Sequence, residues 1–182
     1  MVEADPAAGM GAEATVPEDS RAPTVGAPVG IPNGTQIAGR FVVNGPLGRG
    51  SSGEVLAVQD LSLDREVAMK VLRGAGGPAI ARFMREARIT ARLDHPGVPP
   101  VHTLEFLPDG GLLFTMRRLE GTTLGEAIRR AAAGAPPPAI ASVNAIVSLG
   151  LRICEALSRA HALGIVHRDV KPDNIMLGAH GE

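Results

Sequence analysis

A glycine-rich segment between two apolar runs restricts the possible folds of this chain more than any other feature. Residues 47–55 read Leu-Gly-Arg-Gly-Ser-Ser-Gly-Glu-Val, which gives Gly48, Gly50 and Gly53 the spacing G-x-G-x-x-G. In dinucleotide-binding folds this spacing opens a helix, whereas here residues 54–58 continue as an apolar strand. Glycine amides approach a phosphate closely because no Cβ intervenes. The segment predicts a phosphate-binding hairpin, although a plain flexible hairpin would show the same local pattern.

Short apolar runs separated by turn residues predict a small antiparallel sheet around this hairpin. Strands of this spacing pair with their sequence neighbours, and the Pro-Asp-Gly-Gly sequence at residues 108–111 has the chemistry of a turn. We expect five strands, the first three forming a meander: residues 41–47, 54–59, 66–72, 101–106 and 112–116.

One helix is expected within this lobe, and the chain becomes helical after it. Pro78 suits a first helical turn, and apolar residues recur behind it with helical spacing at Ile80, Phe83, Met84, Ala87 and Ala91. After Gly121 we expect a short helix from residue 122 to the loop at 134–138, and then a longer helix over residues 141–163 that ends at Gly164. Its apolar stripe includes Val143, Ile146, Val147, Gly150, Ile153, Cys154 and Leu157. Cys154 is predicted to be a buried core residue, although the chain offers the stripe as a whole little to pack against, so we also expect a sizeable exposed apolar patch. The fold class is α+β.

The first 37 residues differ from the rest of the chain. Residues 1–37 are rich in Ala, Pro, Gly and acidic side chains and contain almost no large apolar residue. Such a segment buries too little apolar surface to offset the entropy lost on ordering. We therefore expect a disordered tail over residues 1–37.

Composition excludes several classes of partner and compartment. A net charge of −1 and a pI of 6.5 give no electrostatic footprint for nucleic acid or anionic lipid. A single cysteine forms no internal disulfide and fits a reducing cytosol. The chain begins without the basic-then-apolar order of a signal peptide, and no run is apolar enough to cross a membrane. We expect a cytoplasmic chain with no nucleic-acid partner and no membrane segment, of undetermined oligomeric state.

A lysine at the end of the third expected strand marks a second chemical feature. Residues 67–70 read Val-Ala-Met-Lys, and an inward-pointing lysine on an apolar strand is costly unless an anion meets it. Glu86, on the following helix, is the natural partner of Lys70. A local pairing of Glu86 with Arg82 or Arg85 is the alternative.

The run His167-Arg168-Asp169-Val170-Lys171-Pro172-Asp173-Asn174 completes a set of features in a fixed order. His-Arg-Asp, four further residues and Asn form the catalytic-loop pattern of protein kinases. With the glycine-rich segment, the Val-Ala-Met-Lys strand and Glu86, the run makes residues 38–182 resemble a bacterial, eukaryotic-like Ser/Thr protein kinase. The resemblance implies a five-stranded N-terminal lobe with one helix, followed by the first helices of a C-terminal lobe.

The resemblance also implies roles for individual residues. Asp169 would orient the acceptor hydroxyl, Lys171 would neutralise charge on the transferring phosphoryl group, and Asn174 would hold Mg²⁺. Lys70 would contact the ATP phosphates and pair with Glu86. The remaining nucleotide contacts would come from the glycine-rich hairpin, the adenine pocket, the gatekeeper position and the hinge: Leu47, Gly48, Gly50, Gly53, Val55, Ala68, Met116 and Leu119.

These expectations define three segments and a function. Residues 1–37 form the tail, residues 38–119 the N-terminal lobe and hinge, and residues 120–182 a partial C-terminal lobe that stops before any Asp-Phe-Gly segment. The implied parent activity is ATP- and Mg²⁺-dependent phosphorylation of Ser or Thr in protein substrates. We expect the chain to be a piece of a longer kinase with little or no activity of its own. The alternative is a non-catalytic module that binds nucleotide or a partner; a small-molecule phosphotransferase is disfavoured by Lys171 and Arg168.

Overall fold

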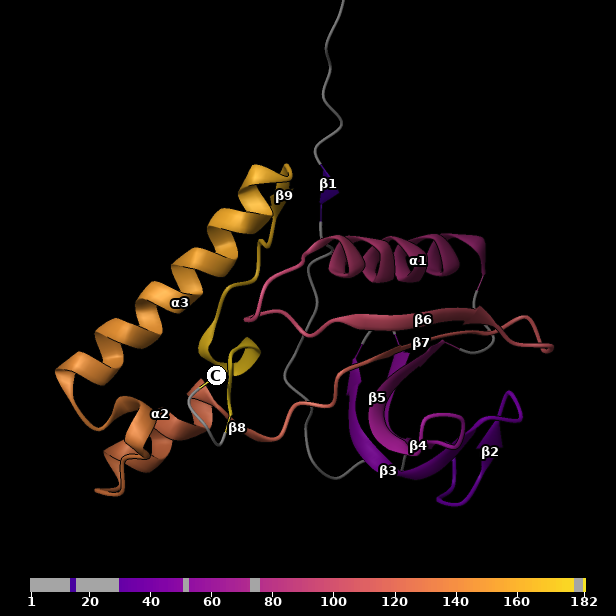
Figure 1. Ribbon diagram of the computed structural model, residues 1–182, viewed down its shortest axis with the longest axis horizontal. Coiled ribbons are helices and arrows are strands. Elements are labelled where there is room, and N and C mark those ends of the chain that lie inside the picture. Colours follow the sequence, from indigo (N-terminus) through magenta and orange to yellow (C-terminus); the bar gives the residue numbers. More distant parts are fainter. Residues whose placement is uncertain (1–13, 16–29, 51–52, 73–75, 179–181) are drawn as a thin grey trace, which may run out of the picture.

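A curled six-stranded antiparallel sheet forms the first half of the molecule (Figure 1). The computed structural model describes residues 14–15, 30–50, 53–72, 76–178 and 182. The strand order is β2-β3-β4-β5-β7-β6. The strands are β2 (Gln36–Ile37), β3 (Phe41–Gly50), β4 (Gly53–Asp60), β5 (Arg65–Leu72), β6 (Val101–Phe106) and β7 (Leu112–Met116). All five predicted strands are present, and the predicted fold class is confirmed.

Helix α1 (Gly77–Arg92) packs across one face of the sheet, against β6 and β7. Pro78 lies in its first turn, as expected. Phe83 is fully buried, and its ring lies 5.1 Å from that of Phe114 on β7 at an interplanar angle of 55°. Ile89 is also buried, whereas the predicted core residue Ala91 is exposed. The difference arises because α1 has two buried faces. Phe83 packs against the sheet, whereas Ile89, later in the helix, packs against Ala160 and Ile165 in the second half of the molecule.

A second apolar core lies on the opposite side of the sheet and includes residues before β3. Ile31 and Ile37 are 6% and 3% exposed and belong to the same buried cluster as Phe41, Val58 and Met69. The expectation of a disordered tail over residues 1–37 is therefore wrong for residues 30–37. The segment is poor in large apolar residues as a whole, but its two isoleucines bury enough apolar surface to hold residues 30–37 against the sheet. Residues 1–13 and 16–29 lie outside the described residues.

An ion pair connects the turn between β2 and β3 to the end of β4. The Arg40 guanidinium donates to both carboxylate oxygens of Asp60 at 2.7 Å, and the Ser62 amide donates to Asp60 at 3.1 Å. Asp60 is only 2% exposed. These donors favour the charged carboxylate, so the pKa of Asp60 lies below its usual value, chiefly because of Arg40.

The second half of the molecule is mostly helical. It contains β8 (Gly121–Thr123), α2 (Leu124–Ala132), the 3-10 turn η1 (Pro138–Ile140), α3 (Val143–Ala162), β9 (Ile165–Val166), the 3-10 turn η2 (Pro172–Asn174) and β10 (Met176–Gly178). Thr123 caps α2 by accepting from the Glu126 amide at 3.1 Å. Gly164 follows α3 with φ 70°, as the predicted end of that helix requires. Antiparallel pairing of β8 with β10 ties the start of α2 to the last described strand.

Helix α3 buries only part of the predicted stripe, together with residues outside it. Leu149 is buried with Ala127 and Leu177, and Ala160 is buried with Ile89 and Ile165. Cys154 is exposed, which corrects its prediction as a core residue. Part of the expected stripe is in solvent, which agrees with the expected apolar patch: Val143 is 76% exposed, Ile146 53% and Val147 55%. Ile153 of the same stripe packs, partly buried, against the cluster of Leu149.

Two further observations complete the fold. Strand β1 (Ala14–Thr15) pairs in parallel with β9, so the two segments lie side by side in Figure 1. Among the helices in the described part of the chain, none combines the length and apolar character needed to cross a bilayer.

Candidate functional site

The strand register brings the predicted phosphate-contacting lysine to the glycine-rich hairpin. Lys70 on β5 is paired with Val55 on β4, two residues after Gly53. Its Nζ donates to Glu86 Oε1 on α1 at 2.5 Å, and the two side chains are 12% and 24% exposed. Glu86 therefore reaches across to the sheet, and the alternative of a local pairing with Arg82 or Arg85 does not hold. The ion pair also holds α1 against β5, because separating the two side chains would leave two partly buried charges without their opposite charge.

The hairpin between β3 and β4 needs glycine for a steric reason. Gly48 pairs with Val55 and Gly50 with Gly53, while residues 51–52 lie outside the described residues. Gly53 has φ 135°, and a Cβ at this position would overlap the backbone carbonyl of Val71 on the adjacent strand. Any other residue would therefore push β4 away from β5.

The residues predicted to surround adenine lie on neighbouring strands. Ala68 on β5 pairs directly with Met116 at the end of β7, and Ala68 is 4% exposed. Val55 is two positions along on the adjacent strand β4, and Leu47 lies on β3 at the start of the hairpin. Leu119 lies beyond β7 and is 40% exposed. The sheet thus assembles four of these five residues, while Leu119 lies in the segment that connects the two halves.

The connecting segment is held to the sheet by two contacts that the sequence did not predict. The Arg117 amide donates to the Pro100 carbonyl at 3.1 Å. Arg118 forms an ion pair with Glu66 at the start of β5, and Glu66 also accepts from Asn44 at 3.0 Å. Arg118 and Glu66 are far apart in sequence, and no local pattern relates them.

The run from His167 to Asn174 folds into a loop around Asp169. Lys171 Nζ donates to Asp169 Oδ2 at 2.8 Å. Asn174 Nδ2 donates at 2.9 Å both to the Asp169 backbone carbonyl and to Oδ2. The Asp169 amide donates to His167 Nδ1 at 3.3 Å, which makes His167 a structural support of the loop. The predicted trio of Asp169, Lys171 and Asn174 is therefore brought together.

Helix α2 supports this loop at a point that sequence reasoning missed. Asp173 lies against the first turn of α2, where a Cβ on Gly125 would overlap its carboxylate. Arg129 Nη1 on the same helix lies 3.7 Å from Asp173 Oδ1. The Leu124 amide also donates to the Ile175 carbonyl at 2.8 Å. A glycine in a first helical turn, where it lowers helix propensity, was the available signal that another group approaches closely.

The donor set of the loop fits a divalent cation held jointly with phosphate groups. Asn174 directs its amide nitrogen at Asp169, so its amide oxygen, the atom that ligates hard cations, lies on the far side of the amide. Mg²⁺ takes oxygen ligands and is usually bound by one or two side chains together with substrate phosphates. This chemistry needs no all-protein cage, and the described residues contain no cluster of three or more His, Cys, Asp or Glu suited to one.

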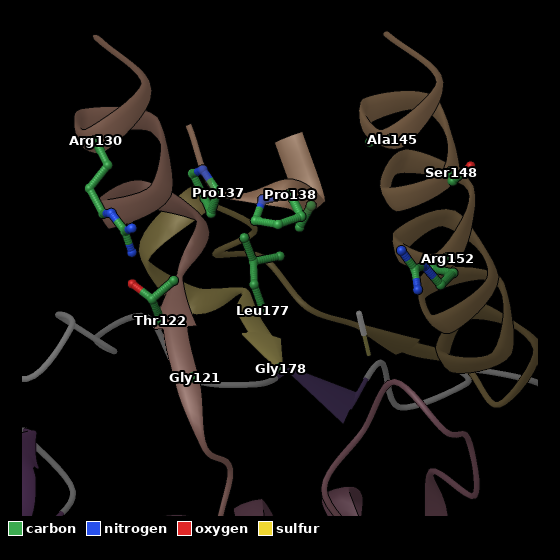
Figure 2. Close-up of a pocket in the computed structure, with 11 residues that line it drawn as sticks. Gly121, Thr122, Arg130, Pro137, Pro138, Ala145, Ser148, Arg152, Leu177 and Gly178 are labelled. Carbon is green, nitrogen blue, oxygen red and sulfur yellow. The ribbon is translucent and has the colours of Figure 1, made fainter. Parts of the chain in front are cut away.

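A separate pocket of about 710 Å³ lies between α2 and α3, away from the glycine-rich hairpin (Figure 2). Thr122, Arg130, Pro138, Ala145, Arg152 and Leu177 are among its lining residues. None of the residues predicted to bind nucleotide, metal or acceptor hydroxyl lines it. It is therefore a second candidate site.

Comparison with known proteins gives one consistent result. The model of the protein kinase domain matches residues 41–182. The serine/threonine-protein kinase PknD of Protochlamydia amoebophila is 34% identical over 144 residues, which is 75% of this chain and 15% of that protein. PknE of Mycobacterium tuberculosis is 39% identical over 149 residues, which is 80% of this chain and 25% of that protein.

A solved structure extends the similarity to three dimensions. The crystal structure of the Mycobacterium tuberculosis PknI kinase domain superposes with a TM-score of 0.62 at 32% identity, over 83% of this chain and 59% of that one. The chain thus spans only 15 to 25% of the length of the two curated relatives and less than two thirds of the solved domain.

Proposed function

Because this chain belongs to the protein kinase family, we propose that it binds ATP between the β3–β4 hairpin and the loop of Asp169, and that it contributes to phosphorylation of Ser or Thr in proteins. The named relatives are serine/threonine-protein kinases. Lys171, two residues after Asp169, supports a Ser/Thr acceptor. An ATP-dependent activity of this kind belongs in the cytoplasm, where ATP is available.

The 2.5 Å contact between Lys70 and Glu86 carries the proposal. A lysine that is only 12% exposed beside a glycine-rich hairpin places one positive charge there, and its ion pair with Glu86 fixes the position of that charge. The α- and β-phosphates of ATP would be attracted to this ammonium group. Glu86 holds the lysine in place, so the ammonium need not reorganise when the nucleotide binds.

The proposed transfer uses the chain's own groups as follows. The acceptor hydroxyl loses its proton to Asp169 while its oxygen bonds to the γ-phosphorus, and the bond from that phosphorus to the β–γ bridging oxygen breaks. ADP leaves with the bonding electrons. Lys171 is 2.8 Å from Asp169 and neutralises charge on the phosphoryl group in transit. Mg²⁺, when bound, would shield the phosphate charges; Asn174 would hold it through the amide oxygen.

Nucleotide binding tests the first half of the proposal. The full chain should bind a fluorescent ATP analogue in Mg²⁺ buffer, and Lys70→Met should weaken binding by about 10- to 100-fold, since a charge-assisted hydrogen bond contributes about 1.5–3 kcal/mol. Arg65→Met is the matched control, because Arg65 is on the same strand but exposed. Equal losses of affinity for the two substitutions would show that Lys70 makes no specific contribution to nucleotide binding.

Phosphate transfer tests the second half. The chain is incubated with γ-labelled ATP and a mixture of peptides containing Ser, Thr or Tyr, in parallel with Asp169→Asn. Label on Ser or Thr that disappears in Asp169→Asn supports the proposal. Nucleotide binding with no transfer by either protein would favour the non-catalytic module instead.

A further inference from the structure

The pocket between α2 and α3 has two positive charges on opposite walls. Arg130 projects from α2 and Arg152 from α3, and Figure 2 shows them on either side of Leu177. None of the 11 lining residues is acidic, although Glu126 accepts from the lining residue Thr122 and the side chain of Glu182 lies against Gly178. Arg130 forms no ion pair with another described residue, whereas its neighbour Arg129 lies 3.7 Å from Asp173. Arg152 already has an interaction within the chain, which a ligand carboxylate would have to share.

The floor between the arginines is apolar and stiff. Leu177 is 5% exposed and belongs to the buried cluster that joins α2 to α3. Pro137 and Pro138 form the adjoining wall at η1, and proline brings neither an amide donor nor a freely rotating φ angle. The Thr122 hydroxyl is committed to Glu126 Oε2 at 2.7 Å. The pocket therefore offers an apolar surface between two cationic edges. Its rigid wall would lose little conformational entropy when a ligand binds.

We propose that this pocket is a docking site for an extended acidic segment of a partner protein. A ligand that matches it carries two anionic groups with an apolar group between them. In an extended peptide, side chains two residues apart point to the same face. Acidic residues at the first and fifth positions and an apolar residue at the third therefore share one face, with the acidic Cα atoms about 13 Å apart. The apolar side chain would lie against the exposed ring of Pro138 beside Leu177, and the carboxylates would meet Arg130 and Arg152.

This site is separate from the proposed nucleotide site but connected to it through the chain. Leu177 lies on β10, three residues after Asn174, and β10 pairs with β8 at the start of α2. Binding of the peptide needs no nucleotide, so the inference stands or falls independently of the proposed kinase activity.

Fluorescence anisotropy of a labelled peptide with the full chain tests the proposal directly. The probe is fluorescein-labelled Glu-Ser-Leu-Ser-Glu at low ionic strength. Arg130→Glu and Arg152→Glu should each weaken binding about tenfold or more, because each opposes a carboxylate with a like charge. Arg129→Glu should change it less than about twofold, since Arg129 is on the same helix but outside the pocket. The three arginines are exposed, and circular dichroism of each variant checks that the fold is intact.

Peptide and anion controls decide the ligand class. Lys-Ser-Leu-Ser-Lys and Glu-Ser-Ser-Ser-Glu should bind at least about tenfold more weakly than the probe, the first for its charge and the second for its missing apolar contact. Inorganic phosphate at matched ionic strength should not displace the probe. No saturable binding up to about 1 mM, equal binding of the lysine peptide, displacement by phosphate alone, or an equal effect of Arg129→Glu would each overturn the proposal.

Discussion

Replacing Phe83 by alanine tests how α1 is anchored to the sheet. Phe83 is 0% exposed, and its neighbours in the cluster are Leu72, Ala87, Leu112 and Phe114. Truncating a fully buried phenylalanine costs about 3–5 kcal/mol, which includes the cavity that remains and about 0.5–1.5 kcal/mol from the aromatic pair. A domain of this size has a total stability of about 5–15 kcal/mol. The substitution should therefore remove a large share of the stability.

The loss should be visible in both chemical and thermal unfolding. For a domain of this length, 1 kcal/mol shifts the Tm by about 2–4 °C, so Phe83→Ala should lower it by about 6–20 °C. Urea unfolding followed by circular dichroism should show a lower midpoint with an unchanged slope, which separates lost stability from a changed unfolded state. Phe83→Leu keeps most of the volume and should lose clearly less.

Phe106→Ala is the matched control, because Phe106 is a phenylalanine of the same sheet that is 67% exposed. Its removal should change stability by no more than about 0.5 kcal/mol. The packing argument is refuted if Phe83→Ala costs less than about 1 kcal/mol or if both substitutions cost the same. In the first case α1 would be held mainly by the contact between Lys70 and Glu86, and Glu86→Gln would then give the larger loss.

Three other predictions follow from single contacts. Because the pKa of Asp60 is lowered from 3.8, its charged form contributes stability at neutral pH that is lost as the pH falls below that value; Asp60→Asn should flatten the pH dependence of the urea midpoint between about pH 5 and about pH 2. Thr123→Ala removes the cap of α2 and should cost about 1 kcal/mol in urea unfolding, whereas Thr123→Ser should cost little. Gly125→Ala should displace Asp173 and abolish any phosphate transfer with little loss of nucleotide affinity; Gly150→Ala, which has open space on α3, should leave both unchanged.

Local patterns were sufficient to place most of the secondary-structure elements. Alternation and turn residues placed five of the six strands of the sheet and missed the two-residue β2, and proline with helical spacing placed α1. The partnership of Lys70 with Glu86 was predicted from the resemblance to protein kinases together with the cost of an unpaired lysine on an apolar strand. The loop trio of Asp169, Lys171 and Asn174 is close in sequence, so its proximity in space required little tertiary information.

Other features depend on which elements meet, and only the tertiary structure shows this. Strand β7 pairs with β5, so β6 lies at the edge of the sheet although it precedes β7 in the chain. Ile31 and Ile37 are buried because the sheet offers them a surface, which their own polar surroundings do not indicate. The contacts of Arg118 with Glu66, and of Gly125 with Asp173, join residues that no periodicity relates.

Helix α3 separates the two kinds of information most clearly. Its amphipathic sequence predicted a helix, its cap at Gly164 was correct, and its apolar residues were identified. The sequence could not show which of those residues would be covered, because a helix with apolar residues around much of its circumference has no single buried face. Contacts with α2, η1 and β9 cover Leu149 and Ala160 and leave Val143 and Cys154 in solvent. Periodicity within a segment is a property of the sequence, whereas burial is a property of the neighbours that the fold brings to it.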